Sequence, residues 1–129
     1  MSELAKGRRR CYAVYALAPD GVSAREANDL LNEYVADRRR GVLVFHDHFT
    51  GKPHGGLAVF DVRDGAAHEL LDDPGPLEGW ELRVHPLVYS LAATGFAELV
   101  GFNLEHYAGT TLEELREAEE PDERYWWRA

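Results

Sequence analysis

The order of short apolar runs and amphipathic stretches is the feature that most limits how this chain can fold. Runs rich in β-branched and aromatic residues, as in strands, occupy four segments: 11–18, 42–49, 57–62 and 80–91. Helical spacing of apolar residues occupies four others: 23–39, 64–72, 95–107 and 111–120. Two of these begin with a capping box, a hydroxyl residue followed three positions later by Glu, at Ser23 and at Thr111. The predicted order is therefore β-α-β-β-α-β, followed by two helices.

This order is typical of the split βαβ, or ferredoxin-like, arrangement. We predict an α+β fold in which a four-stranded antiparallel sheet carries two helices on one face, with two additional C-terminal helices. The 129 residues are expected to form a single domain, with an α+β core over 11–91 and a helical extension over 92–129. Because the predicted strands are apolar on both faces, the second face needs a cover. In this architecture the sheet of a second subunit often supplies it, so we expect a homodimer, a dimeric α+β barrel.

The charge of the chain argues against nucleic acid as a partner, because the formal net charge is −9 and phosphates demand a basic surface. The basic residues at 6–10 and the acidic residues at 113–123 are expected to be solvated or to pair with each other. The arginines at 38–40 suit the negative end of the helix that they follow. Aromatic residues at 125–127 are expected to dock on the body of the protein or on a partner subunit.

No apolar run approaches the roughly 20 residues that cross a bilayer. The apolar stretch that follows residues 8–10 lacks the cleavage site of a signal peptide, so we expect a cytoplasmic protein without a membrane partner. The single cysteine, Cys11, excludes an internal disulfide and is expected to be a buried strand residue rather than a nucleophile. Gly55-Gly56 lacks the following helix and the Lys-Ser/Thr of a phosphate loop, and we expect no cofactor.

Three of the six histidines lie within nine positions, at 46, 48 and 54. Side chains two apart on a strand point to the same side, so His46 and His48 share a face. Pairing Phe49 near Gly56 would place Asp61 on that face as well. A histidine beside Asp61 or Asp73 would suit acid–base chemistry. A metal site is an alternative, formed by the two histidines with one or two further ligands: Asp61, His54, His68 and His85. Hydrogen-bonded or solvated histidines without a site are the structural alternative.

The last predicted strand alternates apolar residues with Glu81, Arg83 and His85, so that an acid, a cation and an imidazole share one face with the phenol of Tyr89 nearby. These residues suit one wall of a pocket. They equally suit charged pairs at a dimer surface. Pro86 cannot donate a hydrogen bond to a ladder and predicts an edge, bulge or break. For Asp73-Pro74 the structural alternative is a turn.

The strand GGLAVFD at 55–61, the short helix after it, Asp73-Pro74-Gly75-Pro76 and the strand that begins GWELR at 79–83 resemble the YCII-related members of the dimeric α+β-barrel superfamily. The resemblance extends over residues 11–91. It implies a cleft near Asp73-Pro74 with a His/Asp active site. The family's histidine usually lies at the start of the first helix, and residues 19–39 of this chain contain none. The role has therefore moved to the second strand or is missing.

The sequence thus predicts a small homodimeric α+β-barrel protein. The first hypothesis is an enzyme that uses His/Asp acid–base chemistry on a small organic molecule, without a metal. Its candidate catalytic residues are His46, His48, Asp73 and His85, and its candidate substrate-binding residues are Arg83, Tyr89 and Asp61. The alternatives are a non-catalytic dimeric module that binds a small molecule, or acts as an accessory protein, and a histidine-based metal site.

Overall fold

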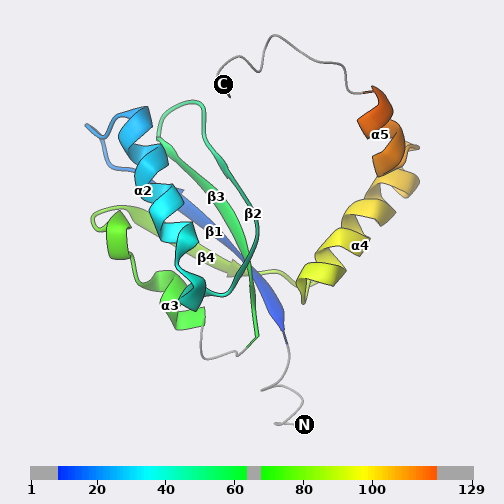
Figure 1. Cartoon of the computed structure of the whole chain (residues 1–129), viewed down its shortest axis with the longest axis horizontal. Helices are drawn as coiled ribbons and strands as arrows, with labels where there is room; N and C mark the ends of the chain where they lie inside the picture. Colours follow the sequence, from blue (N-terminus) through cyan, green and yellow to red (C-terminus); the bar gives the residue numbers. More distant parts are fainter. Residues whose placement is uncertain (1–8, 64–67, 119–129) are drawn as a thin grey trace. The chain divides into compact units, whose positions relative to one another are not determined.

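The computed structural model describes residues 9–63 and 68–118 (Figure 1). Its helices and strands are β1 (Arg10–Leu17), α2 (Ala24–Ala36), β2 (Val42–His48), β3 (Gly55–Val62), α3 (Glu69–Asp72), β4 (Glu81–Pro86), α4 (Ala93–Asn103) and α5 (Leu112–Ala118). Two 3₁₀ turns, η1 (Arg38–Arg40) and η3 (Gly75–Leu77), and a π-helical turn, η4 (Leu104–Ala108), complete the set. The chain divides into two compact units, Met1–Phe96 and Ala97–Ala129, and each is described by itself.

The four strands of the first unit form one antiparallel sheet in the order β2-β3-β1-β4. Helix α2 connects β1 to β2, and the β2–β3 hairpin returns β3 to the side of β1. Figure 1 shows α2 and α3 on the same side of this sheet. The predicted α+β class and antiparallel four-stranded sheet are therefore confirmed, and the strand order is compatible with a ferredoxin-like arrangement.

The main core lies between the sheet and the two helices on this side. Leu31 and Tyr34 of α2 pack with Phe60 of β3, Leu71 of α3 and Leu77 of η3, and all five side chains are fully buried. Burying a side chain of this size stabilises the fold by about 1.5–3 kcal/mol. Helix α2 begins as the capping box predicts, because the Ser23 hydroxyl accepts the Glu26 N–H at 3.1 Å.

The opposite face of the sheet holds a smaller buried cluster of Cys11, Ala13 and Val59. Val44, Leu57, Leu87 and Phe96 pack around this cluster. Two aromatic side chains on the same face stay substantially exposed, Tyr15 at 40% and Phe45 at 38%. Helices α2 and α3 thus leave apolar surface of the first unit accessible on this face.

The register of the β2–β3 hairpin decides which way the two strand histidines point, and a β-bulge interrupts the ladder nearer the start of β2. Leu43 pairs with Phe60 but Phe45 pairs with Val59, so Val44 is an extra residue. Further along, Gly56 faces His48 rather than the predicted Phe49. Because a one-residue change of register reverses the faces, His46 and His48 lie on the helix-covered side. Asp61 pairs with Cys11 on the other side. The prediction that these histidines share a face with Asp61 is wrong.

Other boundaries differ from the prediction for local reasons. Strand β4 ends at Pro86 instead of residue 91, because proline has no N–H for the ladder. Helix α2 ends at Ala36, since Asp37 takes an extended backbone and caps η1 instead. Residues 64–67 of the predicted 64–72 helix, and the aromatic residues at 125–127, lie outside the described residues.

The two C-terminal helices form as predicted, with small shifts at their ends. Helix α4 starts at Ala93 and continues into η4, and α5 opens where the Thr111 hydroxyl accepts the Glu114 N–H at 3.1 Å. Within residues 9–63 and 68–118, no helix combines the length and the apolar character that crossing a bilayer requires.

Candidate functional site

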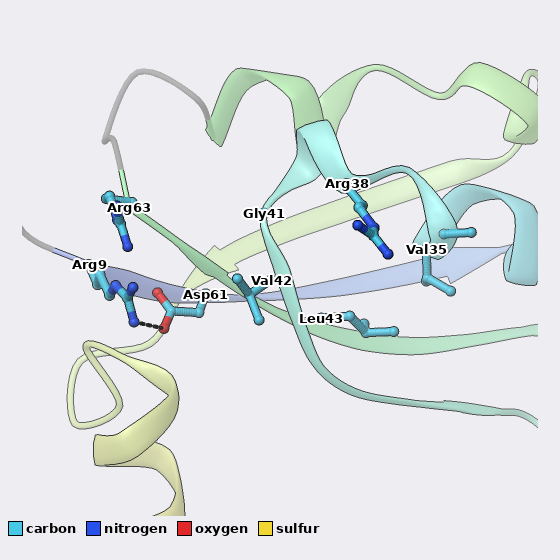
Figure 2. Close-up of a pocket in the computed structure, with 9 residues that line it drawn as sticks. Arg9, Val35, Arg38, Gly41, Val42, Leu43, Asp61 and Arg63 are labelled. Carbon is cyan, nitrogen blue, oxygen red and sulfur yellow. Dashed lines mark ion pairs between the residues drawn. The ribbon is translucent and has the colours of Figure 1, made fainter.

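A pocket of about 490 Å³ lies at the end of the sheet where β1 begins and β3 ends. Three arginines and one carboxylate line it: Arg9, Arg38, Arg63 and Asp61. Its remaining lining comes from the end of α2 and the start of β2, and is mostly apolar. Figure 2 shows Arg9 and Arg63 beside Asp61, with Arg38 on the other side of Val42.

The backbone explains why these charges meet. In the β1–β3 ladder Arg10 pairs with Val62, so Arg9 and Arg63 flank the same end of the two strands. Arg38 is the first residue of η1, directly after the cap of α2. Gly41 brings the start of β2 close to β3, since a Cβ at this position would lie 2.8 Å from the carbonyl oxygen of Asp61.

Asp61 is a buried carboxylate, only 3% exposed. Its Oδ2 accepts the Ala93 N–H at 2.9 Å and lies 3.8 Å from the Arg9 guanidinium. Its Oδ1 is buried and has no hydrogen-bond partner within the described residues. Burial, and then the charge of the neighbouring Asp61, raise the pKa of the Cys11 thiol to about 11. Cys11 is buried, as predicted, and stays a neutral thiol at neutral pH.

The pocket carries an excess of positive charge. Three arginines and one carboxylate line it, an excess of two positive charges in a chain whose net charge is −9. In the part of the chain that the structure describes, neither Arg38 nor Arg63 makes an ion pair. A guanidinium group presents a planar fork of donors that matches a carboxylate or a phosphate. The arrangement therefore suits an anionic ligand.

The three consecutive arginines have three different environments, which the helix-dipole interpretation did not anticipate. Arg39 binds Asp37 at 2.7 Å, and its hydrogen bonds lower the pKa of that carboxyl to about 2. Arg40 is buried and donates to the carbonyl oxygens of Tyr34, Leu70 and Asp73. Arg38 alone enters the pocket.

His46 and His48 form a separate cluster with Asn32 of α2. The Nε2 atom of each ring lies 3.1 Å from Asn32 Oδ1. Burial, and then the charge of His46, lower the pKa of His48. Among the described residues, no three side chains of the His, Cys, Asp or Glu type are placed to hold a metal ion together. The predicted third ligands lie elsewhere: Asp61 is on the opposite face, His68 stacks on Tyr12, and His85 is on β4.

Asp73 ends α3, where its Oδ1 accepts the Gly75 N–H at 3.2 Å and its carbonyl oxygen accepts from Arg40. These contacts are those of a turn residue, and the buried Arg40 fixes its backbone through the carbonyl oxygen. His54, in the β2–β3 loop, lines a second pocket of about 380 Å³ together with Ser23.

Glu81, Arg83 and His85 share the face of β4 that lies opposite α2 and α3, and the prediction that they share one face is confirmed. Arg83 binds Glu81 at 2.8 Å, and the His85 ring lies edge-on to Tyr15 with 6.1 Å between the centroids. Tyr89 lies beyond the end of β4 and is 82% exposed. The structure therefore brings Glu81, Arg83 and His85 to one face, but it does not place Tyr89 on their strand.

Of the residues predicted from the sequence, Asp61 lines the arginine pocket, while the candidate histidines are absent from its described lining. Sequence reasoning missed Arg9, Arg38 and Arg63. A signal was available only in part: Arg9 and Arg63 lie close to the ends of predicted strands, and the ferredoxin-like order would place the first and third strands side by side, whereas Arg38 lies within the predicted helix 23–39. Compared with known proteins, the chain matches no family, no curated protein and no solved structure.

Proposed function

We propose that this protein binds a small organic anion in the pocket formed by Arg9, Arg38, Arg63 and Asp61. The observation that carries the proposal is the excess of two positive charges around a cavity of about 490 Å³ in an otherwise acidic chain. Of the hypotheses drawn from the sequence, this is the small-molecule-binding module. Arg9, Arg38 and Arg63 here take the substrate-binding role that the sequence suggested for Arg83.

The lining supports a ligand that has an anionic group on an apolar body. Arg9 and Arg63 lie near Asp61, while Val42 separates them from Arg38 (Figure 2). A carboxylate or phosphate can accept two parallel hydrogen bonds from one guanidinium, and Val42 and Leu43 offer apolar contact to the remainder of the ligand. Each hydrogen bond to a charged group contributes about 1.5–3 kcal/mol, so the loss of one arginine should weaken binding at least about tenfold.

Acid–base catalysis on the same ligand is a second candidate, and one observation favours it. Asp61 Oδ1 is buried without a hydrogen-bond partner among the described residues and belongs to a pocket-lining side chain. An unpaired carboxylate oxygen is suited to accept a proton from a substrate. In this version Asp61 takes the role that the sequence suggested for the histidines. An Asp61→Asn variant that still binds but shows no turnover would distinguish catalysis from binding alone.

We also propose that two chains associate through the sheet face opposite α2 and α3, giving the dimeric α+β barrel of ferredoxin-like subunits that the YCII-related resemblance implies. Tyr15 and Phe45 support this, because aromatic side chains that are about 40% exposed on one face favour burial against a partner. Charged side chains of β4, among them Arg83 and Glu81, would lie at the rim of such an interface.

Isothermal titration calorimetry at low ionic strength tests the binding proposal. The probes are aromatic carboxylates, aliphatic dicarboxylates and phosphate monoesters. Saturable binding by at least one class is expected, with weaker affinity as salt is added. Arg38→Gln and Arg63→Gln should each weaken it at least about tenfold. Arg25→Gln is the matched control, because Arg25 is an exposed arginine of α2 outside the pocket. Binding that all three variants retain equally would contradict the proposal.

A further inference from the structure

His46, His48 and Asn32 form a cluster of donor atoms that the proposed anion pocket does not use. Nε2 of His46 and Nε2 of His48 each lie 3.1 Å from Oδ1 of Asn32. The two rings are nearly perpendicular, with 5.2 Å between their centroids. Two nitrogen atoms from β2 and one oxygen atom from α2 therefore lie close together. Because Asn32 is exposed, solvent can reach this cluster.

The packing of α2 on the hairpin holds this cluster together. The hairpin register pairs His46 with Ala58 and His48 with Gly56, which turns both histidines toward the helix. Across from His48 stands Gly56, where an added Cβ would lie 2.7 Å from Leu31 Cδ2. Leu31 is fully buried and directly precedes Asn32 in α2. The missing side chain at Gly56 thus lets the helix approach closely enough for Asn32 to reach both imidazoles.

We propose that His46, His48 and Asn32 bind a divalent transition-metal ion. Adjacent ligand atoms at about 2.1 Å from an ion lie about 3.0–3.4 Å apart, from right-angled to tetrahedral geometry. Both nitrogen–oxygen distances in the cluster, 3.1 Å, match this spacing. Imidazole nitrogen with an amide oxygen suits Zn²⁺, Ni²⁺ or Cu²⁺, and water completes the coordination.

The hydrogen bonding around His48 sets how tightly the ion is held. Without metal, each ring donates its Nε2–H to the Asn32 oxygen. Coordination through Nε2 moves the ring proton to Nδ1, with no net release of protons. In the described part of the chain, Nδ1 of His48 is buried and has no partner to accept from it. The ion is therefore expected to exchange with solvent and to be removable by a chelator.

Titration of the untagged, EDTA-treated full-length protein with Zn²⁺ or Ni²⁺ alone tests the site. One ion per chain is expected. His46→Ala and His48→Ala should each weaken binding at least about tenfold, and so should Asn32→Ala. The matched controls are His85→Ala on β4 and Asn28→Ala, one turn earlier in α2, and both should bind like the wild type. Thermal unfolding in EDTA establishes that each variant is folded.

Electron paramagnetic resonance with Cu²⁺ gives a readout that a structural role would not change. The wild type should show coordination by two imidazole nitrogens and His46→Ala by one. Absence of saturable metal binding by the wild type overturns the proposal, as does unchanged affinity in a folded His46→Ala or His48→Ala variant. Affinity that falls in the histidine variants but not in Asn32→Ala overturns the three-donor site.

Discussion

Arg40 offers the sharpest test of how the structure departs from the local pattern of the sequence. Its side chain is 3% exposed, and its guanidinium donates to three backbone carbonyls, those of Tyr34 at 3.0 Å, Asp73 at 2.7 Å and Leu70. The same group lies 3.8 Å from the centre of the Tyr34 ring. Arg40 therefore connects the end of α2 to the turn after α3. We expect Arg40→Met, which keeps the length of the side chain, to destabilise the protein.

The magnitude follows from these contacts. Three carbonyls lose a charged donor, at about 1–3 kcal/mol each, and the contact with the ring adds about 1 kcal/mol. Against this, methionine removes a buried charge whose desolvation costs several kcal/mol. The expected net loss is about 2–4 kcal/mol in the free energy of unfolding, a large part of the total of about 5–15 kcal/mol for a domain.

Urea unfolding followed by circular dichroism measures this loss. Arg39→Met is the matched control, because Arg39 is the exposed neighbour that binds Asp37, and its replacement should cause no measurable change. Arg40→Lys should fall between the two, since one ammonium group cannot reach all three carbonyls. An Arg40→Met variant within about 0.5 kcal/mol of the wild type would refute the reasoning.

Three further predictions follow from the same structure. Gly56→Ala should lower the free energy of unfolding by about 1–3 kcal/mol, because the new Cβ would lie 2.1 Å from the Asp47 carbonyl oxygen; unchanged urea unfolding would contradict the close packing. The pKa of Cys11, raised from 9.0 to about 11, means that the fold favours the neutral thiol. Relative to Cys11→Ala, the free energy of unfolding should be constant below pH 9.0 and decline between pH 9.0 and about pH 11. Rapid iodoacetamide labelling of the folded protein at neutral pH would contradict a buried, neutral thiol. Sedimentation should show a dimer for the wild type and a monomer for Phe45→Glu, and a monomeric wild type at micromolar concentration would end the interface proposal.

The sequence was sufficient for those features that depend on near neighbours in the chain. Both capping boxes form, because the hydroxyl of Ser23 or Thr111 needs only the N–H three residues later. Runs of apolar, β-branched and aromatic residues identified the strands, and the glycines of the loop between 49 and 57 identified the hairpin. Alternation also placed Glu81, Arg83 and His85 on one face correctly.

The candidate site was less predictable, because it depends on pairing between distant segments. The bulge at Val44 inserts one residue into β2, and no local sequence pattern predicts it. A separate one-residue shift at the hairpin, where His48 rather than Phe49 pairs with Gly56, moves His46 and His48 from the side of Asp61 to the side of Asn32. The arginine pocket joins the starts and ends of five elements, β1, α2, η1, β2 and β3, so its charges are neighbours only after the sheet has formed.

Alternation of strand and helix patterns, capping residues and turn residues therefore determined the order of elements and the class of fold. These signals are local, since they act through backbone hydrogen bonds and side-chain spacing within a few residues. Only the tertiary structure decided which polar groups lie close together. Arg38 and Arg63 line one pocket with Asp61, Arg40 donates to the carbonyl oxygen of Asp73, and both histidines contact Asn32. Register and helix packing set those distances, and neither can be derived from the spacing of residues along the chain.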